Sequence, residues 1–281
     1  IEARIYAEDA FNDFLPTGGV IGRFRPANTS HTVTDSAIKD GAFISSSFDP
    51  MLAKVACWCK DRPSALESLR ETLCNTVLLG VTTNIDFLIQ LLHLSDIEES
   101  NYDTKFLEAC ELERAHPSPA VLTAYAAIAA SPSSVASWRA DGWRLNGMPH
   151  ATIAAYIDGV RHDVPTGTHS TLVVDSYRDD DNYWLHHRSV GTWLIKEANE
   201  RRISKDRLSD EIVSPMPGVV IALNVAIGDE VTLGDPLVVI EAMKMEHIVR
   251  ARHSGHVLHC NVTLGANVRV GQLLLEVVED V

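Results

Sequence analysis

The sequence lacks the features that mark several large classes of protein. No apolar run approaches the roughly 18 residues that a membrane-spanning helix needs. Basic residues are outnumbered, with 24 Lys and Arg against 38 Asp and Glu and a formal net charge of −14. Nucleic acids and anionic membrane surfaces attract basic patches, so this acidic excess argues against both. We therefore expect no nucleic-acid partner and no membrane partner.

Cysteines are few and scattered, at positions 57, 59, 74, 110 and 260. The pair Cys57-x-Cys59 lacks the two-residue gap of a zinc or redox motif, and no second pair accompanies it. We expect no metal site from these residues, and we expect all five to be reduced thiols in a reducing compartment.

Motifs of catalysis are also missing. The first 113 residues contain no Gly-rich phosphate loop, metal-binding triad or nucleophile constellation. We therefore expect no catalytic residue in this chain. The chain begins at Ile1 rather than at Met, from which we expect the parent protein to extend further towards its N-terminus.

The composition is that of a globular protein, with 46% apolar and 22% charged residues among 281, which is enough for two or three domains. The first part mixes strands and helices. Residues 2–7 predict a short strand, and Asp61 predicts a helix start that is followed by Leu66, Leu69, Leu73 and Val77 at helical spacing. A second amphipathic run, residues 85–92, begins after Asn84.

The middle of the chain predicts one helix among many strands. Ser118 and Pro119 suit an N-cap and a first helical position, and the following residues to about Ala130 are apolar on almost every side. A helix of this kind is buried all round. Strands are predicted at 143–145, 151–157, 170–174, 183–187 and 191–196. We expect a β-barrel or curved sheet around a central helix, followed by a charged linker at 197–210.

The last part contains an internal repeat. Residues 218–241 align with residues 255–278, and eight positions are identical: Gly218, Val220, Asn224, Val225, Gly228, Val231, Gly234 and Leu237 against Gly255, Val257, Asn261, Val262, Gly265, Val268, Gly271 and Leu274. Glycines at fixed intervals among apolar alternations predict short strands joined by tight turns. We expect the two copies to pack into one flattened β-barrel of two quasi-symmetric halves.

The seam between the two copies is Glu241-Ala242-Met243-Lys244-Met245-Glu246. These six residues all favour helix, and in isolation they would predict a solvated helical turn. The β-branched residues on both sides, Val238 to Ile240 and Ile248-Val249, instead predict two strands with Lys244 on an exposed turn. A lysine so placed between two methionines is an attachment site.

Ala242-Met243-Lys244-Met245 resembles the biotin-attachment motif of biotinyl domains. The resemblance implies that Lys244 carries covalent biotin and that Met243 and Met245 are flanking recognition residues. Lipoyl domains share the fold but usually have Asp-Lys-Ala at this tip, so a lipoyl carrier is the second hypothesis. A third is a non-enzymatic assembly module with a vestigial tip.

Five blocks in the first 110 residues resemble the C-terminal third of a biotin carboxylase domain: IEARIYAED, FLPTGG, FDPMLAK, GVTTNIDFL and TKFLE. The resemblance implies one wall of the site where ATP and bicarbonate react, with the phosphate loop and the magnesium-binding residues outside these 281 residues. It also places a functional arginine where this chain has Val33, and neither Arg23 nor Arg25 can be assigned that role. We do not expect this fragment to carboxylate biotin alone.

Together these parts resemble the C-terminal portion of an acyl-CoA carboxylase α subunit, an α+β multidomain protein. The predicted segments are 1–113 (end of the biotin carboxylase domain), 114–196 (subunit-contact or BT-like domain), 197–210 (linker) and 211–281 (biotinyl domain). The resemblance implies a hetero-oligomer with a carboxyltransferase β subunit, modification by a biotin protein ligase, and ATP, Mg²⁺ and bicarbonate as further requirements. It places the protein in the mitochondrial matrix of a eukaryote or the cytoplasm of a bacterium.

The acyl-CoA is predicted from two residues. Glu246-His247 after Met245 looks more like methylcrotonyl-CoA carboxylase, an enzyme of leucine catabolism, than like the propionyl enzymes, where Gln-Asn is familiar. Propionyl-, geranyl- and acetyl-CoA stay open as alternatives.

Overall fold

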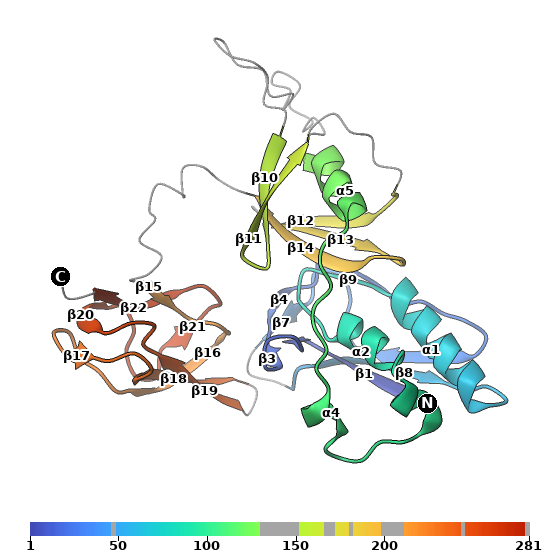
Figure 1. Ribbon diagram of the computed structural model, residues 1–281, viewed down its shortest axis with the longest axis horizontal. Helices are drawn as coiled ribbons and strands as arrows, with labels where there is room; N and C mark the ends of the chain where they lie inside the picture. The colour runs from blue at the N-terminus through green and yellow to red at the C-terminus, as the bar shows by residue number, and fades with distance from the viewer. Residues whose placement is uncertain are drawn as a thin grey trace, which may run out of the picture. The chain divides into compact units, whose positions relative to one another are not determined.

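The computed structural model describes residues 1–45, 49–129, 152–165, 172–179, 182–197, 211–242 and 245–278. The chain divides into two compact units, the first made of residues 1–6, 20–42 and 52–199 and the second of residues 7–19, 43–51 and 200–281. Helices and sheets are combined as the sequence predicts, so the expected α+β class is confirmed (Figure 1). No helix within the described ranges is long and apolar enough to cross a membrane.

The first part of unit 1 is a sheet with helices packed on it. The sheet order is β1-β8-β6, with β1 at Glu2–Tyr6, β8 at Met51–Cys57 and β6 at Thr32–Ser36. Helices α1 (Arg62–Asn75) and α2 (Ile85–Leu91) pack against β6 and β1. The remaining elements are β5 (Arg23–Arg25), β9 (Val77–Leu79), α3 (Ser95–Glu99) and α4 (Phe106–Ala109). Three short strands belong to unit 2: β2 (Glu8–Asp9), β3 (Leu15–Pro16) and β7 (Phe43–Ile44). Strand β4 (Gly19–Val20) lies at the boundary between the two units.

Helix α1 starts where the sequence predicts. The Asp61 carboxylate accepts a hydrogen bond from the Ser64 N–H at 2.9 Å, which satisfies one of the free donors of the first turn. The helix ends at Asn75, so its expected continuation to Val77 is wrong. Val77 is 1% exposed and lies in β9, where it pairs with Arg25 of β5, because the buried sheet position outweighs the helical spacing.

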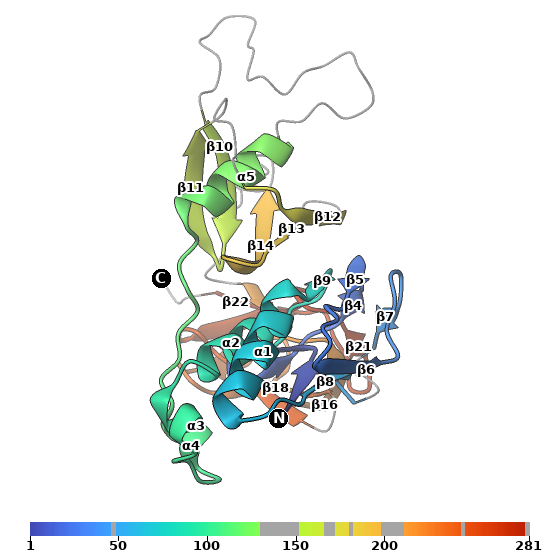
Figure 2. The ribbon, with the colours of Figure 1, turned by 90° about the vertical axis from the view of Figure 1, so that its right-hand side faces the viewer.

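The second part of unit 1 is a five-stranded antiparallel sheet with one helix on its face (Figures 1 and 2). The sheet order is β11-β10-β14-β13-β12, with the strands at Val160–Pro165, Thr152–Ile157, Gly191–Glu197, Asn182–His187 and Asp175–Asp179. Helix α5 (Pro119–Ala129) buries Val121, Ala124 and Tyr125 against this sheet. The expected combination of a sheet with one helix is confirmed, with the helix on one face of an open sheet.

The sequence-based expectations for this part differ from the structure at one predicted strand, one strand that was not predicted and one linker residue. Residues 172–174, expected in a strand, are not in one; the strand is β12, whose Asp179 pairs with Asn182 of β13. Pairing with β13 outweighs the β-branched run before β12. Strand β11 was not predicted because its sequence VRHDVP is polar. The expected linker residue Glu197 ends β14. The predicted strand at 143–145, the rest of the linker and Ala130 lie outside the described residues.

Unit 2 contains two four-stranded sheets around one apolar core. One has the order β15-β22-β20-β17 and the other β19-β18-β16-β21. The strands are β15 (Glu211–Val213), β16 (Gly218–Leu223), β17 (Glu230–Val231), β18 (Pro236–Ala242), β19 (Met245–Arg250), β20 (Gly255–Cys260), β21 (Asn267–Val268) and β22 (Leu273–Val278). A shift of 37 residues (255 minus 218) converts one strand order into the other, so the two quasi-symmetric halves are confirmed.

Hydrogen bonds repeat with the same offset. The Gly228 N–H donates to the Val257 carbonyl at 2.8 Å, and the Gly265 N–H donates to the Val220 carbonyl at 2.8 Å. Each half therefore closes its turn on a strand of the other half. Both glycines have positive φ, +92° and +80°, a region that disfavours other residues.

Candidate functional site

The seam of the repeat is a β-hairpin rather than a helical turn. Strand β18 ends at Ala242 and β19 begins at Met245, and these two residues face each other in the antiparallel register. Met243 and Lys244, the two residues between them, lie outside the described residues, so their predicted roles stay predictions. Strand β18 pairs with β16 on one side and β19 on the other, and this pairing overrides the helical propensity of the segment.

The hairpin is held by its buried face. Leu237 and Ile240 are 0% exposed and Ala242 is 2% exposed, and all three belong to the core of unit 2. Met245, at the start of β19, keeps 43% of its surface exposed. The core thus fixes the two strands up to Ala242, the last residue before the connection. The side chain of Met245, the first residue after the connection, is open to solvent.

Two carboxylates face each other beside this connection. Glu241 and Glu246 are directly paired across β18 and β19, and both are exposed. Like charges opposite each other destabilise a sheet, so this pair is a local cost to the fold. Sequence reasoning did not single out the pair. The available signal was the glutamates at both ends of the EAMKME segment, which a two-residue connection brings into register.

The three residues considered for the family's arginine position lie in unit 1. Val33 is on β6, opposite Ala56 of β8, and is 69% exposed. Arg23 and Arg25 lie on β5, where both form ion pairs with Asp175 of β12; the Arg23 Nη1 to Asp175 Oδ1 distance is 3.2 Å. Both arginines are therefore engaged with the five-stranded sheet, and neither is assigned the role of the arginine that the resemblance places at Val33.

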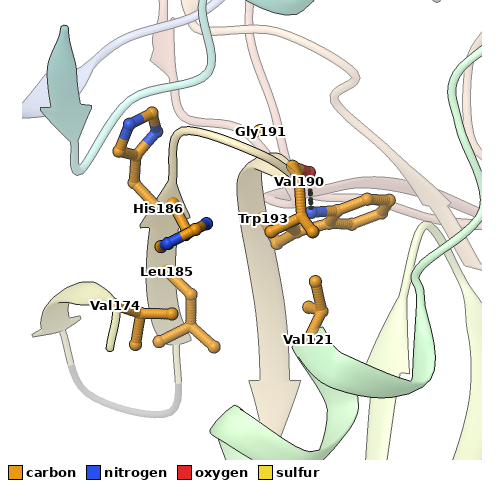
Figure 3. A pocket seen from close by; sticks show the side chains of 8 residues that line it. Val121, Val174, Leu185, His186, Val190, Gly191 and Trp193 are labelled. Carbon is orange, nitrogen blue, oxygen red and sulfur yellow. Dashed lines mark hydrogen bonds between the residues drawn. The ribbon is translucent and has the colours of Figure 1, made fainter. Parts of the chain in front are cut away.

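A hollow between α5 and the β13–β14 hairpin is a second candidate location for a ligand (Figure 3). Its walls are mostly apolar, with Val121, Leu185, Val190 and Trp193 among them, and it has no room for a water molecule. The Trp193 Nε1–H donates to the Val190 carbonyl at 2.6 Å, which satisfies the ring nitrogen inside the protein. This hollow is part of the packing of the sheet on its helix.

All five cysteines are free thiols.

Two segments of the chain match known families. Residues 2–109 match the family described as biotin carboxylase C-terminal domain, and residues 210–277 match the family described as biotin-requiring enzyme. These matches confirm the expected resemblance to the α subunits of biotin-dependent acyl-CoA carboxylases.

Curated relatives include two kinds of carboxylase. The propionyl-CoA carboxylase α chain of Mus musculus is 28% identical over 99% of this chain and 46% of its own length. The methylcrotonoyl-CoA carboxylase subunit α of Rattus norvegicus is 39% identical over 38% of this chain and 15% of its own length. The corresponding subunit of Arabidopsis thaliana is 30% identical over 71% of this chain and 25% of its own length. The chain therefore spans less than half of the relatives it matches.

One similar solved structure contains bound nucleotide and bicarbonate. It is the biotin carboxylase domain of Hydrogenobacter thermophilus 2-oxoglutarate carboxylase with MgADP, ADP and bicarbonate. The two chains are 29% identical over an alignment that covers 38% of this chain and 24% of the solved one, with a TM-score of 0.38.

Proposed function

We propose that this chain is part of the biotin-carrying α subunit of an acyl-CoA carboxylase, with biotin attached to Lys244. The observation that carries the proposal is the hairpin whose paired ends, Ala242 and Met245, are joined by Met243 and Lys244 inside the segment that matches biotin-requiring enzymes. We assign residues 1–113, 114–196, 197–210 and 211–281 to the carboxylase end, the subunit-contact domain, the linker and the carrier.

The hairpin fits this cofactor because it combines a rigid base with an open end. The core residues of β18 fix the base, while Met245 and the paired glutamates leave the surroundings of the connection exposed. Biotin, once attached, carries a carboxyl group between two separate sites. The Nζ amine of Lys244 acts as a nucleophile only when a biotin protein ligase forms the amide bond. Afterwards the lysine is a tether, and the charged segment 198–210 lengthens it.

The other steps of the reaction would be carried out by the rest of the α subunit and by a partner subunit. ATP, Mg²⁺ and bicarbonate would be used by the part of the α subunit that lies outside these residues, and a carboxyltransferase β subunit would accept the carboxyl group. We place the complex in the mitochondrial matrix of a eukaryote or the cytoplasm of a bacterium. The mitochondrial names of the relatives support the first placement.

Attachment is tested by co-expression with a biotin protein ligase. Wild type should give a streptavidin signal and a biotin adduct on Lys244 by mass spectrometry, and Lys244→Arg should give neither. Lys54→Arg, a change at a half-buried lysine of β8, serves as the matched control. Wild type without an adduct would overturn the proposal, and a lipoyl adduct would identify the other carrier class. Unchanged turnover of a Lys244→Arg holoenzyme would identify an assembly module.

For the acyl-CoA we propose 3-methylcrotonyl-CoA, on the basis of Glu246-His247 and the two methylcrotonoyl relatives. Propionyl-CoA is the second candidate, because a propionyl-CoA carboxylase α chain aligns with 99% of this chain. Carboxylation of each acyl-CoA by the reconstituted holoenzyme, measured as kcat/KM, decides between them. A higher value for propionyl-CoA would refute the first choice.

A further inference from the structure

Within unit 1, three neighbouring strands of the five-stranded sheet contact the first part of the unit, which contains β5, β9, α1 and α2 and is called here the carboxylase-like part. Asp175 of β12 pairs with Arg23 and Arg25, and Trp184 of β13 packs on Val77 and Leu79 of β9. Trp184 is 7% exposed, so this is a dry contact. The third contact, at the start of β14, is polar and joins segments far apart in the sequence.

That third contact centres on Asp86, in the first turn of α2. Its Oδ2 atom accepts a hydrogen bond from the Thr192 N–H at 3.3 Å, across 106 residues of sequence. Burial raises the pKa of the Asp86 carboxyl to about 6, while the Thr192 N–H and the nearby Arg114 hold it down. A carboxylate in such surroundings needs its donors, because an unpaired one is costly to bury.

Gly191 makes this approach possible. A Cβ atom on Gly191 would lie 2.8 Å from Asp86 Oδ1, closer than real side chains come, and its φ of +78° also disfavours other residues. Gly159, in the β10–β11 turn, has the same φ of +78°, but a Cβ atom there would meet nothing within 4 Å. A side chain at position 191 would displace the Asp86 carboxylate, so the contact between Asp86 and Thr192 depends on glycine there.

Thr192 extends the contact to a buried histidine. His186 Nδ1 lies 2.9 Å from Thr192 Oγ1, and His186 Nε2 lies 3.2 Å from the Cys74 carbonyl oxygen (Figure 3 shows His186 and Gly191). A carbonyl only accepts, so Nε2 carries the proton and Nδ1 accepts from the threonine hydroxyl. Burial lowers the pKa of His186, which favours this neutral form. The chain of contacts runs from α2 through β14 and β13 to the end of α1.

We propose that Asp86 and Gly191 form a docking latch that fixes the start of β14 on the carboxylase-like part. Strand β14 ends at Glu197, from which segment 198–210 leads to the carrier. The latch would thus fix the strand whose far end leads into segment 198–210, and Asp86 acts as a positioning residue. This role in the arm rests on the proposed function, whereas the latch itself does not.

Amide hydrogen exchange of the full chain tests the latch at Thr192. Asp86→Ala removes the acceptor and should speed exchange of this amide about tenfold, the equivalent of one net hydrogen bond. Asp86→Asn keeps an acceptor oxygen and should restore slow exchange. Gly191→Ala should act like Asp86→Ala, while Gly159→Ala, with equal backbone strain and no clash, should leave Thr192 as in wild type.

Unchanged exchange at Thr192 in both Asp86→Ala and Gly191→Ala would overturn the latch. Equal effects of Gly191→Ala and Gly159→Ala would also overturn it, because backbone strain alone would then explain both. Biotinylation of Lys244 by the ligase should be equal in all four variants. A wild-type chain that takes no biotin would contradict the proposed function and leave the exchange results on the latch intact.

Discussion

Asp86→Asn should change how the stability of unit 1 depends on pH. The carboxyl of Asp86 titrates with a pKa of about 6 in the folded protein, against a reference value of 3.8. The folded state therefore binds more protons than the unfolded state between these two values. Stability from this group is fully present below about pH 4 and is lost as the pH rises to about 6.

The size of the effect follows from the two pKa values. A difference of roughly two units at 1.36 kcal/mol per unit gives about 3 kcal/mol. This is an upper limit, because the side chain keeps some contact with solvent. Asparagine has no titrating group but still offers an oxygen to the Thr192 N–H. The unfolding free energy of Asp86→Asn minus that of wild type should therefore rise by about 1 to 3 kcal/mol between pH 4 and pH 7.

Tryptophan fluorescence during urea unfolding reports this unit alone. The five tryptophans, at positions 58, 138, 143, 184 and 193, all belong to unit 1. His186, whose pKa is lowered by burial, destabilises the fold as the pH falls, but it does so in both proteins and cancels in the difference. Asp163→Asn, at an exposed carboxylate of β11, is the matched control. A difference that is flat from pH 4 to pH 7, or that falls, would refute the assignment of the buried charge to Asp86.

Two further predictions concern the carrier and the first helix. Leu237→Ala and Leu274→Ala remove repeat-related side chains that are both 0% exposed. Each should lower the unfolding free energy of unit 2, measured by calorimetry, by about 2 to 5 kcal/mol. A difference between the two losses above about 2 kcal/mol would contradict the symmetry. Asp61→Ala should cost about 1 kcal/mol in tryptophan-monitored unfolding because it removes the α1 cap, whereas Asp61→Asn should cost less; equal losses would point to charge rather than capping.

Local patterns predicted the repeated strands of unit 2 well. The 37-residue offset between identical glycines predicted two interleaved halves, and the β-branched runs around the EAMKME segment predicted a hairpin against its helical propensity. Asp61 and Ser118-Pro119 likewise predicted helix starts. These signals are readable because turn geometry, capping and the alternation of buried side chains depend on residues close together in sequence.

Local patterns failed where distant segments decide the outcome. Val77 has helical spacing but pairs with Arg25, and Asp175 to Asp179 form a strand because Asn182 onward lies opposite. Pairing and burial against a remote partner outweigh spacing and propensity in both cases.

The sequence by itself thus determined the repeat, the hairpin around Lys244 and the resemblance to biotin-dependent carboxylases. Only the tertiary structure decided which carboxylate is partly shielded from solvent and which backbone N–H it accepts a hydrogen bond from. Asp86 and Thr192 are separated by 106 residues, and nothing near either one in sequence indicates the other. Their contact exists because the sheet packs on α2 and Gly191 lets the backbone come close, which is a property of the folded chain.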